Sequence, residues 1–161
     1  VLHPDFWSGC FFMPELQQIF EALGGWFLTP PDALAEKLAR VKALVFDWDG
    51  VFNDGVKNDA GSSTFSEVDS MGTNLLRFGL WLHQGRMPAV AVITGVHNER
   101  ALELVGREHF HAGYVQAKHK VAVLEHFLNQ HGLQAHEVAF FFDDALDLSV
   151  AAVVGVRILV R

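Results

Sequence analysis

The chain has 161 residues, of which 50% are hydrophobic and 19% are charged. This composition excludes a disordered chain, and the length suits one domain with a single buried core. The net charge of −7 leaves no cationic surface of the kind that nucleic-acid binding requires. No apolar run reaches the roughly 18 residues of a membrane span, and the single cysteine, Cys10, cannot form an internal disulfide. We therefore expect a cytoplasmic protein without nucleic-acid or membrane partners.

Two helices are predicted before residue 41. Residues 14–25 carry apolar side chains near helical spacing and end in two glycines, and residues 32–40 follow two prolines. The aromatic residues of this region are Phe6, Trp7, Phe11, Phe12, Phe20, Trp26 and Phe27. We interpret them as packing over the main core or in an oligomer contact, with a ligand pocket as the alternative. Residues 1–40 are thus expected to form a helical N-terminal extension.

Strand and helix patterns alternate from residue 41 onward. Short apolar runs predict buried strands at 41–46, 89–93, 138–142 and 156–160. Between them, helical patterns occupy residues 72–83, 98–108, 120–130 and 146–153. This alternation predicts an α/β fold, a Rossmann-like three-layer sandwich with a mainly parallel sheet and helices on both faces. Residues 41–161 form the predicted core, whose ligands should bind beyond the carboxyl ends of the strands.

Polar side chains follow three of the predicted strands, and a lysine begins one of the helices. These residues are Asp47 and Asp49, then Thr94, then Asp143 and Asp144, and Lys120. A cluster of buried carboxylates costs several kcal/mol per ion unless a cation offsets the repulsion, and oxygen ligands suit Mg²⁺. Both acids of the first pair can face one site if the chain leaves the strand between them, a turn that Gly50 permits. For any one pair, the alternative interpretation is capping of the following helix.

The residue types at these strand ends suit phosphoryl transfer through a carboxylate nucleophile. One aspartate would attack phosphorus, and a second would protonate the leaving oxygen and then activate water. A lysine, a hydroxyl group and Mg²⁺ would neutralise charge on the transferred group. Every component of this set is present in the sequence.

Residues 45–51, 93–95 and 143–147, together with Lys120, resemble in their order the four motifs of haloacid dehalogenase superfamily phosphatases. The similarity is greatest to a nearly capless branch that includes 3-deoxy-D-manno-octulosonate 8-phosphate phosphatases. Residues 65–72 resemble the substrate loop of that branch. The resemblance covers about residues 41–160 and implies a Mg²⁺-dependent phosphatase of a small phosphorylated metabolite, in particular an acidic sugar phosphate.

The resemblance implies roles for the matched acids. Asp47 would be the nucleophile and a metal ligand. Asp49 would be the acid and base, and would offer its backbone carbonyl to the metal. Asp143 would be the third protein ligand of Mg²⁺, with Asp144 and Asp147 in supporting positions on the acidic loop.

The remaining implied roles concern the substrate. Thr94 and the Gly95 amide would hold the phosphate, and Lys120 would bridge the phosphate and Asp47. The substrate loop would contribute Ser66, Asp69, Ser70 and Gly72. Relatives in this branch also suggest a homo-oligomer, with a tetramer favoured.

Four features depart from the family pattern. Phe142 stands where glycine usually precedes the acid pair, and we expect it to crowd the metal loop. Val96 stands where an arginine is common, residues 55–65 form a shorter hairpin than relatives use, and the chain stops at Arg161 before their closing segment. Phe142 and the missing closing segment support an alternative function, a catalytically weak scaffold or oligomerisation module related to those attached to sugar-nucleotide synthetases.

Other functional classes have weaker support. His109 and His111 lack further ligands at metal-binding spacing. Receiver domains use aspartates, threonine, lysine and Mg²⁺, but they carry the acid pair on the first strand, whereas the adjacent pair here comes late. Gly24 and Gly25 do not belong to a dinucleotide-binding motif.

Overall fold

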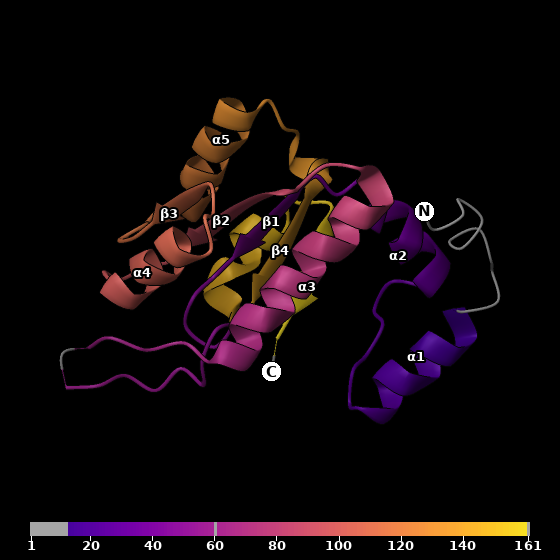
Figure 1. The fold of residues 1–161 in the computed structure, drawn as a ribbon, viewed down its shortest axis with the longest axis horizontal. Helices are drawn as coiled ribbons and strands as arrows, with labels where there is room; N and C mark the ends of the chain where they lie inside the picture. The colour runs from indigo at the N-terminus through magenta and orange to yellow at the C-terminus, as the bar shows by residue number, and fades with distance from the viewer. Residues whose placement is uncertain (1–12, 60, 161) are drawn as a thin grey trace. The chain divides into compact units, whose positions relative to one another are not determined.

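The structure is a computed structural model that describes residues 13–59 and 61–160. The chain divides into two compact units, residues 1–39 and residues 40–161 (Figure 1). The first unit contains the predicted helices, α1 (Met13–Ala22) and α2 (Pro31–Leu38), and the ring of Phe20 packs against Phe27 at 4.8 Å. Cys10 and the aromatic residues at 6, 7, 11 and 12 lie outside the described residues. The role of this unit as a cover or an oligomer contact stays a prediction.

The second unit contains a sheet of five parallel strands in the order β3-β2-β1-β4-β5. The strands are β1 (Ala43–Phe46), β2 (Ala89–Ile93), β3 (Ala112–Tyr114), β4 (Val138–Phe142) and β5 (Val156–Leu159). Because β1 lies in the centre between β2 and β4, the carboxyl ends of the three strands that carry polar chemistry are neighbours. The predicted parallel α/β sheet is confirmed.

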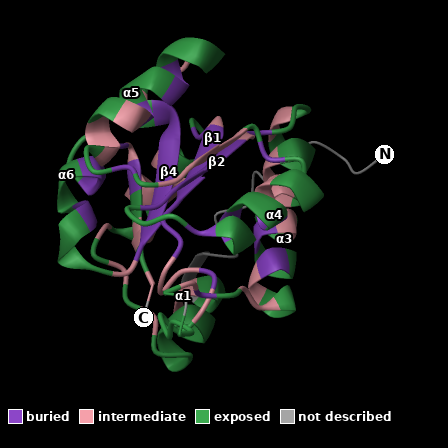
Figure 2. Cartoon of the chain, turned by 90° about the vertical axis from the view of Figure 1, so that its left-hand side faces the viewer, coloured by how far each residue is buried: buried purple, intermediate pink, exposed green. Residues whose placement is uncertain are grey.

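Helices cover both faces of the sheet. They are α3 (Glu67–Gln84), α4 (Glu99–Arg107), α5 (Lys120–His131) and α6 (Leu148–Ala151), with short 3₁₀ turns η2 (Ala135–Glu137) and η3 (Ala145–Asp147). Figure 2 shows α3 and α4 on one side of the buried strands and α5 and α6 on the other. This arrangement is the predicted three-layer sandwich.

One face of the sheet packs against α5 and α6 in a continuous apolar core. Phe140 from β4 and Phe127 from α5 are both completely buried in it, each burial contributing about 1.5–3 kcal/mol. Phe142 belongs to the same cluster and its ring stacks on Phe140 at 5.5 Å. The ring of Phe142 therefore lies in the core, and it does not crowd the acidic loop that follows.

Three expectations about elements need correction. Strand β3 was not predicted, because Ala112–Tyr114 is short and contains a glycine. Helix α3 begins five residues earlier than predicted, because the Ser66 side chain accepts a hydrogen bond from the backbone of Val68 and caps the helix.

The third correction concerns the expected hairpin at 55–65, which contains no strand among its described residues. It runs out and back as a loop (Figure 1), closed by a turn in which the Asn58 N–H donates to Ser62 O at 2.9 Å. Residues 53–65 are called the flap loop below. No helix in the described part of the chain is long and apolar enough to cross a membrane.

Candidate active site

The centre of the site is the segment that follows β1. Asp47 is 7% exposed, and its N–H donates to the carbonyl of Phe141 at 2.9 Å, which ties the end of β1 to β4. The chain then turns sharply at Gly50, whose φ is +75°. A Cβ at Gly50 would lie 2.0 Å from Asp143 Oδ2, so only glycine lets the loops after β1 and β4 approach this closely. The turn expected from the sequence is confirmed.

Lys120, the first residue of α5, joins two of the acids. Its Nζ lies 2.8 Å from Asp47 Oδ1, and 2.6 and 2.9 Å from the two carboxylate oxygens of Asp147. Burial opposes the charged ammonium, but the two carboxylates outweigh this effect and raise the pKa of Lys120 above its usual range. Lys120 is therefore a cation held against Asp47, as its expected role requires.

The loop after β4 carries Asp143 and Asp144, which behave differently. Burial, followed by the charges of Asp144 and Asp47, raises the pKa of Asp143. Asp144 is exposed, and its carboxylate accepts a hydrogen bond from the Leu146 N–H at 2.8 Å, which caps η3. The capping interpretation thus applies to Asp144, whereas Asp143 belongs to the acid cluster.

The donor set at this loop fits a divalent cation. Asp47 and Asp49 both raise the pKa of Asp143 through their charge, so a cation among these oxygens would relieve the repulsion. In the described part of the chain, no group of three His, Cys, Asp or Glu side chains has the arrangement of a metal site. The expected ligands, which are the side chains of Asp47 and Asp143 and the backbone carbonyl of Asp49, stay a prediction.

Thr94 and Gly95 follow β2 at the same edge of the sheet. Thr94 is buried, its N–H donates to Tyr114 O at 2.9 Å, and its carbonyl accepts from the Ala117 N–H at 3.0 Å. Gly95 is exposed. The β2 loop is thereby joined to the loop that leads into Lys120, which places the expected phosphate-binding residues on neighbouring loops.

A hollow of about 500 Å³ lies beside this second loop. Its lining includes Tyr114, Gln116, Lys118, His119 and His126, and none of its lining residues is acidic. The hollow lies along the loop that leads into Lys120 and along the first turns of α5, and none of the clustered acids lines it.

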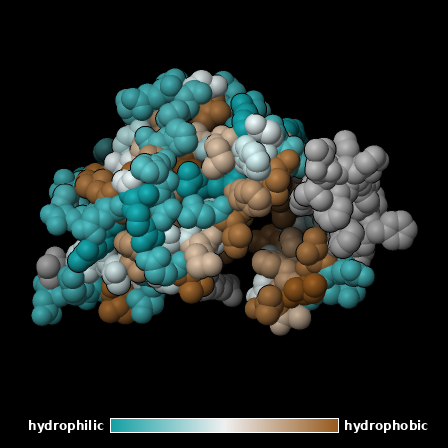
Figure 3. All heavy atoms as spheres, viewed as in Figure 1, coloured by the Kyte–Doolittle hydropathy of each residue, from teal (hydrophilic) through white to brown (hydrophobic). Residues whose placement is uncertain are grey.

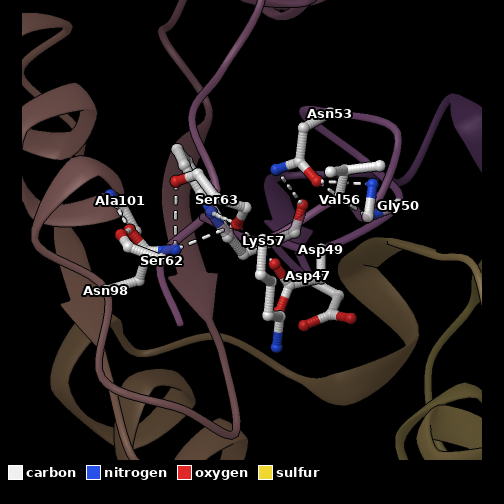
Figure 4. A network of polar contacts seen from close by, with 12 residues as sticks. Asp47, Asp49, Gly50, Asn53, Val56, Lys57, Ser62, Ser63, Asn98 and Ala101 are labelled. Carbon is white, nitrogen blue, oxygen red and sulfur yellow. Dashed lines mark hydrogen bonds and ion pairs between the residues drawn. The ribbon is translucent and has the colours of Figure 1, made fainter. Parts of the chain in front are cut away.

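The Asp49 side chain is held by two residues of the flap loop (Figure 4). Asp49 Oδ1 accepts a hydrogen bond from Ser63 Oγ at 2.5 Å, and Asp49 Oδ2 lies 3.1 Å from Lys57 Nζ. Neither partner was predicted, because loop residues carry no periodic signal. Asn98, which donates to Ser63 Oγ at 3.0 Å and caps α4, was not predicted either. An asparagine directly before a helical pattern is a recognisable capping signal.

Four of the predicted substrate residues lie at the start of α3. Ser66 is the cap of α3, Asp69 lies in the first turn and Gly72 is exposed farther along the helix. Ser70 is buried on the side of α3 that meets α4. A substrate role for these residues stays a prediction.

The hydroxyl of Ser70 is occupied by neighbours on α4. It accepts a hydrogen bond from Arg107 Nη2 at 2.7 Å and donates to Glu108 Oε1 at 3.1 Å. These contacts connect α3 to α4, so they stabilise the fold beside the site.

No model of a known protein family matches the sequence, and neither does any curated protein. Solved structures match the fold. A structure assigned to haloacid dehalogenase superfamily (subfamily III A) hydrolases, from Legionella pneumophila, is 28% identical with a TM-score of 0.65, covering 77% of this chain and 66% of that one. A 3-deoxy-D-manno-octulosonate 8-phosphate phosphatase from Yersinia pestis is 25% identical with a TM-score of 0.67, covering 78% and 66%.

The chain has the haloacid dehalogenase fold. The resemblance predicted from the four motifs is confirmed, because the strong structural neighbours are hydrolases of that superfamily and include octulosonate 8-phosphate phosphatases. Such neighbours are consistent with the predicted phosphoric monoester hydrolase.

A third structure with this fold, a 3-deoxy-D-manno-octulosonate 8-phosphate phosphatase from Moraxella catarrhalis, was solved with a magnesium ion, a phosphate ion and the octulosonate sugar acid. It is 20% identical with a TM-score of 0.66, covering 79% of this chain and 71% of that one. The chain spans about two thirds of the length of the solved structures it matches.

Proposed function

We propose that this chain is a Mg²⁺-dependent phosphatase that hydrolyses a small phosphorylated metabolite through a phospho-aspartate on Asp47. The observation that carries the proposal is the contact between Lys120 Nζ and Asp47 Oδ1 at 2.8 Å, at the carboxyl end of the central strand. A buried carboxylate beside a fixed cation is a suitable nucleophile, because the cation neutralises the charge of the approaching phosphate.

The chain's own residues account for two chemical steps. In the first, an Asp47 oxygen attacks phosphorus, the bond from phosphorus to the leaving oxygen breaks, and Asp49 gives that oxygen a proton. In the second, Asp49 takes a proton from water, which attacks the phospho-aspartate and releases phosphate. Thr94, the Gly95 amide and Lys120 would hold the phosphoryl oxygens. Bound Mg²⁺ would offset the negative charge of the phosphate, held by the side chains of Asp47 and Asp143 and the Asp49 carbonyl.

The proposed substrate class is an acidic sugar phosphate. The named activity of the Yersinia pestis neighbour and the sugar acid bound in the Moraxella catarrhalis structure support this class. A homo-oligomer, with a tetramer favoured, and a cytoplasmic location are further parts of the proposal. The location rests on the single cysteine in the sequence.

Hydrolysis of p-nitrophenyl phosphate with and without Mg²⁺ tests the proposed activity. We expect turnover that depends on Mg²⁺, followed by a preference for 3-deoxy-D-manno-octulosonate 8-phosphate over glucose 6-phosphate in a panel of phosphorylated sugars. Absence of Mg²⁺-dependent hydrolysis would contradict the proposal and favour the scaffold alternative. Equal rates across the panel would contradict only the substrate class.

A further inference from the structure

Ser63 lies at the meeting point of three polar groups. It is 2% exposed, although it belongs to the otherwise largely exposed flap loop. Its hydroxyl oxygen lies 2.9 Å from Trp48 Nε1, 3.0 Å from Asn98 Nδ2 and 2.5 Å from Asp49 Oδ1. Figure 4 shows Ser63 between Asn98 and Asp49. A buried serine hydroxyl has one hydrogen to donate and two lone pairs to accept, so three hydrogen-bond partners use its full capacity.

The direction of each hydrogen bond is determined by the partners. The indole N–H of Trp48 can only donate. The Asn98 amide is oriented because its Oδ1 accepts from the backbone N–H groups of Arg100 and Ala101 at 3.0 and 3.4 Å, and from Ser62 Oγ at 3.1 Å. Asn98 Nδ2 therefore points at Ser63 and donates to it.

These two donors use both acceptor positions of the Ser63 hydroxyl. A serine hydroxyl has two lone pairs and one hydrogen, so the hydrogen is left for the remaining neighbour, Asp49 Oδ1. The 2.5 Å separation between Ser63 Oγ and Asp49 Oδ1 makes this a short hydrogen bond. Ser63 therefore donates its hydroxyl hydrogen to Asp49 Oδ1, because the other two partners are both donors.

The two oxygens of the Asp49 carboxylate are consequently different. Oδ1 is occupied by a buried donor. Oδ2 lies 3.1 Å from Lys57 Nζ, and solvent reaches this ion pair, because the Lys57 side chain is 38% exposed and the Asp49 side chain 25%. A lysine with a flexible stem and one ion pair can leave this position when a substrate arrives.

We propose that Ser63 is a positioning residue that fixes the Asp49 carboxylate so that Oδ2 is the oxygen presented to the leaving group. The inference rests on the proposed phosphatase function. When Lys57 leaves Oδ2, this oxygen takes up a proton from solvent. In the first step an Asp47 oxygen bonds to phosphorus, the bond from phosphorus to the leaving oxygen breaks, and the proton on Oδ2 passes to that leaving oxygen. In the second step Oδ2 takes a proton from the attacking water, which restores the starting state.

The position of Ser63 also depends on the loop after β2. Asn98 Nδ2 donates to the Ser63 carbonyl at 3.2 Å as well as to its hydroxyl, and Asn98 caps α4. The β2 loop carries Thr94 and Gly95, the expected phosphate-binding residues. The orientation of Asp49 is therefore connected to the same loop that would hold the phosphate.

The test compares Ser63→Ala with Ser63→Thr, which restores a hydroxyl, and with Thr64→Ala, which removes an exposed hydroxyl from the neighbouring residue. First-turnover rates are measured with Mg²⁺ for p-nitrophenyl phosphate, whose leaving group needs little protonation, and for phenyl phosphate, which needs more. We expect Ser63→Ala to lose about 10-fold to 100-fold in rate with phenyl phosphate, because a mispositioned acid loses only part of the roughly 10²–10⁴ of acid and base catalysis, and clearly less with p-nitrophenyl phosphate. KM should change less than kcat.

The matched variants and a proton signal separate the possible results. Thr64→Ala should behave as wild type, and Ser63→Thr should recover part of the lost rate. Equal losses of Ser63→Ala on both substrates, or no loss, would overturn the inference while the wild-type activity upheld the phosphatase. In proton NMR spectra, a slowly exchanging hydroxyl signal should be lost in Ser63→Ala and shifted in Asp49→Asn. If the wild-type protein hydrolyses neither substrate, the proposed roles of Asp49 and Ser63 in catalysis are overturned. The NMR hydroxyl signal still decides in that case whether Ser63 donates a hydrogen bond to Asp49.

Discussion

Asp147 is completely buried, and both of its carboxylate oxygens lie within 3 Å of Lys120 Nζ, at 2.6 and 2.9 Å. Burial raises the pKa of Asp147 to about 6, although its hydrogen bond with Lys120 favours the ionised form. The contacts with Asp147 hold the Lys120 ammonium in the position where it also contacts Asp47 Oδ1. Asp147 therefore acts on the proposed nucleophile through the lysine, in addition to its place on the acidic loop.

Replacing Lys120 with methionine should destabilise the protein and abolish turnover. The substitution leaves the Asp147 carboxylate buried without a cation, which commonly costs about 3–5 kcal/mol in the free energy of unfolding. Urea unfolding followed by circular dichroism measures this loss. Adding Asp147→Asn to Lys120→Met should recover part of it, because the amide needs no counterion. Equal stability of wild type and Lys120→Met would show that the pair contributes nothing to the fold.

Replacing Asp47 with asparagine should abolish turnover and leave the fold intact. The amide has nearly the same shape as the carboxylate but is a poor nucleophile, and loss of one member of a catalytic unit costs on the order of 10⁴ to 10⁶ in rate. Steady-state hydrolysis of p-nitrophenyl phosphate and a thermal melt of the purified variant measure the two effects. Near-normal turnover in Asp47→Asn would eliminate the phospho-aspartate mechanism.

Mg²⁺ should raise the melting temperature, because its site exists only in the folded state. At 100 times the dissociation constant, the stabilisation is about 2.7 kcal/mol, which corresponds to roughly 5–10 °C for a chain of this size. Asp143→Ala should remove this increase in melting temperature. The reference for each protein is its melting temperature in a buffer that contains a chelator and no divalent cation. An unchanged increment in Asp143→Ala would place the metal elsewhere.

Gly50→Ala should weaken both the fold and the proposed metal site. A non-glycine residue at a φ of +75° costs about 1–3 kcal/mol, and the added Cβ would overlap the Asp143 carboxylate. We therefore expect a lower melting temperature and a smaller Mg²⁺ increment than in wild type. Gly61→Ala is a matched control, because its φ is +73° and a Cβ there meets no other atom within 4 Å. A full Mg²⁺ increment in Gly50→Ala would contradict the close approach of the two loops.

Acid should destabilise the protein partly through His111. Partial desolvation, followed by the charges of His131 and Arg77, lowers the pKa of His111 below 6.5, although the residue is exposed; its Nδ1 accepts a hydrogen bond from the Val90 N–H at 3.1 Å. Below about pH 6.5 the histidine becomes protonated in the unfolded chain, whereas in the folded chain it stays neutral down to a lower pH. The free energy of unfolding therefore decreases as the pH falls.

The variant His111→Asn tests this pH dependence. The asparagine retains an acceptor for Val90 and does not titrate, so its stability should fall less than that of wild type between pH 7.5 and pH 5.5. Urea unfolding at the two pH values gives the difference. Identical losses in both proteins would exclude His111 as a source of the acid sensitivity.

Self-association should involve an apolar stripe on α3. The stripe consists of residues spaced alternately by three and four positions, Val68, Met71, Leu75, Phe78 and Leu82, with exposed fractions from 42% to 75%. Figure 3 shows apolar residues along the strip that α3 occupies in Figure 1. Light scattering should give a mass above the 17.9 kDa of the monomer, and Leu75→Glu should reduce it. A monomeric wild type at all concentrations would contradict the expected homo-oligomer.

Local sequence pattern alone predicted β1, β2 and β4 and the polar residues that follow these three strands. A central parallel strand is buried on both faces, so it reads as an apolar run, and acids directly after it lie at its carboxyl end. Asp47, Thr94 and Asp143 were assigned to one edge on this basis. Helix starts were less predictable: the α3 start was missed, although Ser66 and Asp69 have the spacing of a capping signal.

The orientation of Asp49 was decided by the tertiary structure. Its partner Ser63 is 14 residues away in a loop without periodicity, and Asn98, which orients Ser63, is 35 residues farther along the chain. No local pattern encodes a hydrogen bond across such separations, because it depends on how the flap loop and the loop after β2 meet. The same reason applies to Phe142, which is an anomaly in the motif but a core residue once β4 is placed between β1 and β5. Periodicity determines which side chains are buried, and only packing determines which of them meet.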